Sequence, residues 1–138
     1  MMKLRPLFTA LACLWGVTSS ADNAELVAME DLPRVELTAE LISQRCSGFY
    51  KAMNTRSLET GISPEILDLV VSSGQRAESY ALSLSSADRA TDVLDNIANY
   101  EVAYLRNFRE TETQVNMIQS PNRLFASDRA TCFNGFGP

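Results

Sequence analysis

The spacing of the apolar residues is the feature that most limits what this chain can fold into. Large apolar side chains recur every three or four positions, as in Ile42, Cys46, Phe49 and Met53. This period places them on one face of a helix. No stretch alternates between apolar and polar residues for long enough to predict a strand. The sequence therefore predicts an all-α fold, a small bundle of three to four helices with one long member.

Capping residues place the first two helices. Thr38 can cap a helix over residues 38–53, and a loop is expected over residues 54–62. Ser63 followed by Pro64 predicts the start of a second helix, which continues to about residue 85. Gly74 in its middle indicates close approach of a neighbouring helix. The side chains expected to face inward are Ile66, Val70, Ala77, Ala81 and Leu84.

The apolar pattern after Ser86 predicts a third helix that runs to about residue 119. Such a helix would be about 33 residues and about 50 Å long, whereas a globule of this size is only about 35 Å across. Either the helix bends around residues 111–113, or the molecule is elongated, or the helix end packs on a second subunit. A fourth helix is expected over residues 122–132, with a non-helical tail after it.

The first residues have the pattern of an export signal. Lys3 and Arg5 precede an apolar run over residues 7–17, and residues 19–21 are small. The run is too short to span a bilayer, which takes about 20 residues. We therefore expect a signal peptide over residues 1–21 and a mature protein that is periplasmic or secreted, without a transmembrane segment.

Cleavage after Ala21 would leave an N-terminal arm over residues 22–37 and a helical domain over residues 38–138. A lipid anchor is the alternative. The string Ala10-Leu11-Ala12-Cys13 resembles a bacterial lipoprotein box, in which the cysteine is acylated. It departs from that motif at Ala10, where a large aliphatic residue is expected.

Export would bring Cys46 and Cys132 into an oxidising compartment, where a disulfide can persist. Their distance along the chain favours a structural bridge over a redox-active pair, because redox pairs are commonly Cys-x-x-Cys. A bridge that closes so long a loop contributes roughly 4–5 kcal/mol in the chain-entropy model.

Charge and the lack of histidine exclude several functions. The net charge of −5 would fall to −7 once Lys3 and Arg5 are removed, which argues against nucleic acid as a partner. The chain contains no histidine, so the usual general base and the commonest metal ligand are missing. We expect no metal or other cofactor and no enzymatic activity. A small hydrolase that uses acidic residues is the weaker alternative.

Glu101 falls in the same helical stripe as Ile97 and Phe108. A carboxylate on a core stripe must find a partner or become protonated, and the candidates are Arg45 and the hydroxyl of Tyr104. A buried salt bridge, or a stripe open to solvent, would explain Glu101 without a binding role. Tyrosine and arginine are enriched at interfaces. The candidate contacts to a partner or ligand are Glu101, Tyr104, Tyr100, Arg106 and Arg109.

These observations predict a small exported helical protein that acts as a non-enzymatic interaction or structural module. Its expected partner is another protein or a second copy of the chain.

Overall fold

The computed structural model describes residues 25–115 and 120–138, and this part of the chain is all-helical. The α-helices are α1 (Ala39–Thr60), α2 (Pro64–Ser83), α3 (Ala90–Glu110) and α4 (Arg123–Phe136). Two short 3-10 helices precede α1 and α3: η2 (Met29–Asp31) and η3 (Ala87–Arg89). The prediction of an all-α bundle is confirmed, and α1 is its longest helix, with 22 residues.

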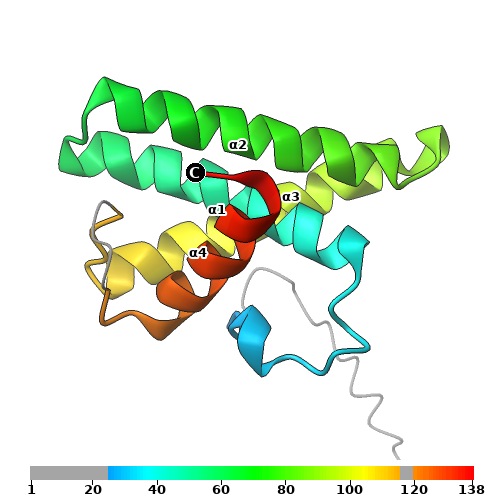
Figure 1. Cartoon of the computed structure of the whole chain (residues 1–138), viewed down its shortest axis with the longest axis horizontal. Helices are drawn as coiled ribbons and strands as arrows, with labels where there is room; N and C mark the ends of the chain where they lie inside the picture. Colours follow the sequence, from blue (N-terminus) through cyan, green and yellow to red (C-terminus); the bar gives the residue numbers. More distant parts are fainter. Residues whose placement is uncertain (1–24, 116–119) are drawn as a thin grey trace, which may run out of the picture.

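The central element is α1. It packs against α2 and α3 along its length, while α2 and α3 make few contacts with each other. Figure 1 shows α4 lying across α1 on the near side, with η2 beside it. Helices α1, α2 and α3 therefore form one layer, and α4 and η2 cover one face of it.

Two glycines bring the helix axes of this layer close together. A Cβ on Gly48 of α1 would lie 2.6 Å from the Cβ of Tyr100 and 2.8 Å from the main-chain nitrogen of Glu101, both in α3. A Cβ on Gly74 of α2 would lie 3.1 Å from the Cβ of Tyr50 in α1. The close approach predicted at Gly74 is thus present, and a closer one occurs at Gly48.

An aromatic cluster fills the space between α1, α3 and α4. The ring of Phe49 lies 5.3 Å from that of Tyr104, 5.8 Å from Phe108 and 5.6 Å from Phe125, measured between centroids. All four side chains are buried. Full burial of each such ring contributes about 1.5–3 kcal/mol, so this cluster is a major source of stability.

The predicted starts of α1 and α2 are confirmed. The hydroxyl of Thr38 accepts a hydrogen bond from the main-chain N–H of Leu41, and α2 begins at Pro64. Of the residues expected to face inward on α2, the three central ones are buried, namely Val70, Ala77 and Ala81. The two terminal ones, Ile66 and Leu84, are 40% and 43% exposed, because they lie near the ends of α2.

The first helix is longer than predicted and continues to Thr60 instead of ending near Met53. It ends because Gly61 adopts a left-handed conformation, with φ 78°, and donates its N–H to the carbonyl of Ser57. A glycine in this position is a common helix terminator. The expected nine-residue loop over 54–62 is therefore wrong, and only residues 61–63 connect α1 to α2.

The third helix ends at Glu110, so the prediction that it runs to about residue 119 is also wrong. Of the three alternatives for its length, the bend near residues 111–113 holds. Glu112 has φ 51°, and the N–H of Thr113 turns back to the carbonyl of Phe108. The side-chain amide of Asn122 then donates to both Thr111 and Thr113. The helix length therefore gives no argument for a second subunit.

The last helix starts as predicted, with the side chain of Asn122 accepting from the N–H of Phe125. It does not stop at Cys132, however, and continues through the expected tail to Phe136. Tertiary contacts explain this. The ring of Phe133 stacks on Tyr50, with centroids 6.0 Å apart.

The residues around the end of α4 are hydrogen-bonded to α1 and α2. The hydroxyl of Tyr50 donates to the carbonyl of Gly137 at 2.6 Å, and Arg76 Nε donates to that of Phe136 at 2.9 Å. Ser73 Oγ donates to the main-chain oxygen of Pro138 at 2.6 Å. These contacts offset the poor helix propensity of the glycine-rich sequence.

A disulfide joins Cys46 of α1 to Cys132 of α4, as predicted, with the Cα atoms 5.3 Å apart. The expected signal peptide and Cys13 lie outside the described residues. In the part of the chain that the structure describes, no helix is long and apolar enough to cross a membrane.

We predict that Gly48→Ala lowers the free energy of unfolding by about 1–3 kcal/mol, because the added methyl group meets the backbone of α3. Gly135→Ala in α4 is the control, since its added Cβ would meet no atom within 4 Å outside its chain neighbours and the adjacent backbone of α4. It should gain about 0.5–1 kcal/mol from helix propensity. Urea denaturation measures both values, and equal effects at the two sites would contradict the close packing.

The disulfide should supply a large share of the stability. Because it closes a loop with a sequence separation of 86 residues, Cys46→Ala combined with Cys132→Ala should cost about 4–5 kcal/mol. Urea denaturation with and without reductant measures this loss. The reductant should destabilise the native chain and leave the double variant unchanged; a native chain insensitive to it would argue against the bridge.

Candidate functional site

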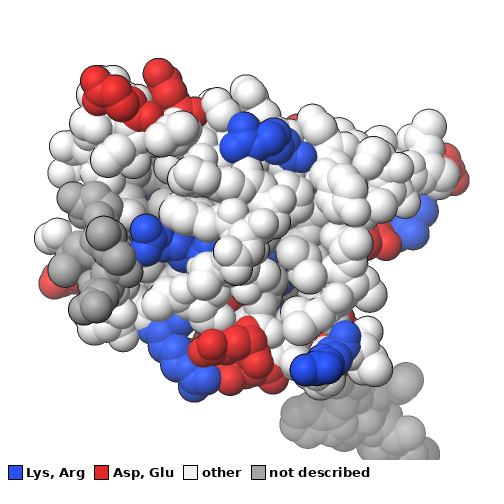
Figure 2. All heavy atoms as spheres, in the orientation of Figure 1, with Lys and Arg blue, Asp and Glu red and all other residues white. Residues whose placement is uncertain are grey.

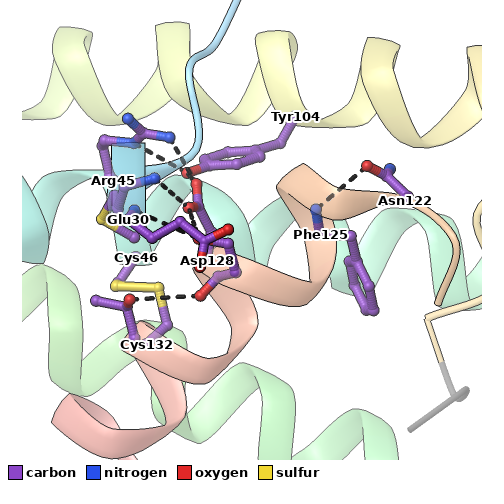
Figure 3. A network of polar contacts seen from close by, with 11 residues as sticks. Glu30, Arg45, Cys46, Tyr104, Asn122, Phe125, Asp128 and Cys132 are labelled. Carbon is purple, nitrogen blue, oxygen red and sulfur yellow. Dashed lines mark hydrogen bonds and ion pairs between the residues drawn. A yellow bond between two sulfur atoms is a disulfide. The ribbon is translucent and has the colours of Figure 1, made fainter. Parts of the chain in front are cut away.

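Arg45, Tyr104 and Asp128 form a hydrogen-bonded network inside the core (Figure 3). Arg45 Nη2 lies 2.6 Å from Asp128 Oδ2, and Arg45 Nε donates to the hydroxyl of Tyr104 at 3.0 Å. The hydroxyl of Tyr104 donates in turn to Asp128 Oδ2. The three residues come from α1, α3 and α4, and none is more than 3% exposed. The network therefore ties these helices together out of reach of solvent.

The surroundings of Tyr104 and Arg45 raise the pKa of both groups. Burial raises the pKa of Tyr104 well above its usual value, and the negative charge of Asp128 raises it further. Burial alone would lower the pKa of Arg45, but the contacts with Tyr104 and Asp128 outweigh it, and the net shift is upward. Tyr104 thus stays a hydrogen-bond donor and Arg45 stays charged. The network stabilises the fold and offers no surface to a substrate.

The same carboxylate holds the segment before α1. Asp128 Oδ1 accepts a hydrogen bond from the main-chain N–H of Met29 at 2.7 Å. Arg123 at the start of α4 pairs with Glu30 at 3.0 Å and with Asp31 at 2.7 Å. Figure 2 shows basic and acidic side chains side by side where η2 meets α4. Because Arg123 is exposed, water screens these two ion pairs, and the buried bond to Asp128 is the stronger link.

The sequence offers Arg45 and Tyr104 as candidate partners of Glu101, with a stripe open to solvent as the alternative. In the structure both residues bind Asp128 instead. A local signal for Asp128 exists, because it lies three residues after Phe125 and four before Cys132, on the apolar face of α4. That face holds one carboxylate among buried apolar side chains, which indicates a buried partner.

Glu101 lies instead on the wall of a groove of about 360 Å³ between α2 and α3, over α1. We call this the α1–α2–α3 groove. Tyr50, Val70 and Gly74 are its buried residues. The residues nearer its rim are Lys51, Asn54, Thr55, Val71, Gln75, Glu78 and Glu101.

Three charged residues line the groove. Lys51 Nζ of α1 lies 2.6 Å from Glu78 Oε2 of α2. Glu101 of α3 makes no hydrogen bond or ion pair with any residue that the structure describes. The groove therefore carries one uncompensated negative charge beside an apolar floor.

The groove and the polar network lie on opposite sides of α1. Phe49 faces α4, where it contacts Phe125, whereas Lys51 lines the groove. Two positions along an α-helix correspond to a rotation of about 200°. The face of the layer that α4 and η2 leave uncovered is thus the one that contains the groove.

The structure does not bring the five predicted contact residues into one patch. Tyr104 is buried in the network, and Tyr100 is half-buried, with its ring 6.0 Å from the Arg45 guanidinium. Burial raises the pKa of Tyr100, partly opposed by the charge of Arg45. The exposed Arg109 pairs with Glu59 at the far end of α1. Arg106 is partly buried, and Glu101 lines the groove.

The other possible chemistry on the described surface is limited. Residues 25–115 and 120–138 contain no group of three acidic, cysteine or histidine side chains that could hold a metal ion. A second, more apolar hollow of about 470 Å³ lies between Ile42, Tyr80 and Phe136. That hollow is also lined by Arg76, whose guanidinium is hydrogen-bonded to the Phe136 carbonyl and the Ser73 hydroxyl. Glu101 in the α1–α2–α3 groove has neither a hydrogen bond nor an ion pair with a described residue, so this groove is the better candidate site.

The network predicts how stability depends on alkaline pH. Because folding raises the pKa of Tyr104, the folded chain keeps a proton that the unfolded chain loses above about pH 10. The free energy of unfolding should therefore fall as the pH rises past 10, by up to about 1.4 kcal/mol per pH unit for this one group. Urea denaturation from pH 7 to 11 measures the slope. Tyr104→Phe should make it shallower, and an unchanged slope would contradict the assignment.

No protein-family model, no curated protein and no solved structure matches the chain. The role proposed for the groove therefore depends on its own chemistry.

Proposed function

We propose that this chain is a small exported helical protein that acts without catalysis, as an interaction module whose partner protein docks in the α1–α2–α3 groove. The observation that carries the proposal is the groove itself, with its apolar floor and the uncompensated carboxylate of Glu101. Specific interfaces combine an apolar centre with a few polar groups that fix orientation. The groove has both, on the face that α4 leaves uncovered.

Exposed aliphatic side chains lie on the rim of the groove and beyond it. Val71 on α2 is 40% exposed and Leu94 on α3 is 41% exposed. Val71 precedes Glu78 by seven residues, and Leu94 precedes Glu101 by seven, so each aliphatic residue shares a helix face with a groove carboxylate. A protein partner would cover Leu94 as well as Val71, whereas a ligand confined to the groove would leave Leu94 in water.

Export and a non-enzymatic role are supported by separate features. The disulfide is compatible with an oxidising compartment, and the export signal expected over residues 1–21 would deliver the chain there. The chain has no histidine, and the ionisable groups of its central network, Arg45, Tyr104 and Asp128, are buried in the core. Both features favour binding over catalysis.

Site-specific photocrosslinking in the native host tests this function. A benzoylphenylalanine at Gln75, an exposed groove residue, should give a discrete crosslinked partner. The same group at Ala130, exposed on α4, should not. Val71→Asp should weaken the complex about tenfold or more, because a charged side chain replaces an apolar contact with the partner. The fold should stay intact, because Val71 is exposed in the free protein. Crosslinks of equal yield at both positions, or none at Gln75, would refute docking in the groove.

A further inference from the structure

The apolar part of the α1–α2–α3 groove fits an aliphatic stem, meaning the methylene chain of a long side chain such as lysine or arginine. Gly74 packs so closely on Tyr50 that a Cβ would lie 3.1 Å from the Tyr50 Cβ. Both residues and Val70 are at least nine-tenths buried, so the floor is fixed by the core. Its volume of about 360 Å³ is near the lower end for small-molecule pockets, which suits one or two side chains better than a cofactor.

The net negative charge around this floor favours binding of a cation. Lys51 and Glu78 neutralise each other across the rim at 2.6 Å, and Glu101 on the facing helix has no partner among the described residues. One further positive charge would neutralise the groove. The net charge of the whole chain, −5, acts in the same direction, since it raises the local concentration of cations.

We propose that the groove binds a lysine or arginine side chain of a partner protein, with its stem on Val71 and Gly74 and its cationic group at Glu101. This inference rests on the proposed docking function. Such a side chain combines an apolar stem with a charged end, as the groove requires. An aliphatic residue beside the cation would cover Leu94, which is 41% exposed, so the partner segment is both basic and aliphatic. A second copy of this chain is a poorer match, because two grooves would face each other with like charge.

Matched peptides test the charge requirement. A capped leucine–arginine–leucine tripeptide and its citrulline analogue, which has the same shape without the charge, would be titrated into the exported, disulfide-bonded protein and followed by amide NMR shifts. The arginine peptide should shift the amides of Val71, Gln75 and Glu101, and the citrulline peptide should bind about tenfold or more weakly. Equal affinities, or shifts confined to α4, would overturn the proposal.

Variants separate the groove carboxylate from general charge. Glu101→Gln should reduce binding of the arginine peptide to the level of the citrulline peptide, and stability should change little because Glu101 makes no ion pair with a described residue. Glu110→Gln, exposed at the end of α3, is the matched control and should bind normally. If both variants lose affinity equally, the effect is nonspecific and the proposal fails.

Three further outcomes distinguish this inference from the proposed docking function. If the arginine peptide does not bind while the crosslink at Gln75 persists, the cation is the wrong ligand and docking in the groove stands. If light scattering shows a dimer that Val71→Asp dissociates, the occupant is a second copy and the proposed partner is wrong. If neither peptide nor crosslink is found, both proposals fall.

Discussion

The ion pair between Arg45 and Asp128 fixes the position of α4 on the rest of the protein. Removing both charges from water costs several kcal/mol per ion, and this cost is offset only when the two side chains and their hydrogen bonds are all in place. The bridge between Cys46 and Cys132 lies directly beside the pair, one residue later on α1 and four later on α4. An ionic contact and a covalent one thus define a single docking arrangement for the last helix.

This arrangement determines which face of α1 is available for binding. Phe49 is directed to the α4 side, where it contacts the rings of Tyr104, Phe108 and Phe125. On the opposite face, Tyr50 forms part of the groove floor, and the smaller Asn54 and Thr55 leave the groove open. Close packing at Gly48 and Gly74 brings the flanking helices near enough to form its walls. Stability and the proposed binding therefore use different sides of the same helix.

Local signals in the sequence were enough to place the helix starts, because a cap such as Thr38 or a proline such as Pro64 acts within one turn. The fold class followed from the period of the apolar residues. The choice of buried acid did not, since Glu101 and Asp128 both lie on apolar stripes and only the docking of α4 decides which one meets Arg45. The groove was equally hidden, because its residues come from three different helices and only their packing brings these residues together.

The sulfur bridge also controls how the molecule would respond to mechanical load. Every residue that lines the groove lies between Cys46 and Cys132 in the chain. Tension applied to the segments on either side would travel from α1 to α4 through the covalent link and bypass the enclosed helices. A protein held at both ends would thus keep α2, α3 and the groove between them unstretched for as long as the cysteines stay oxidised.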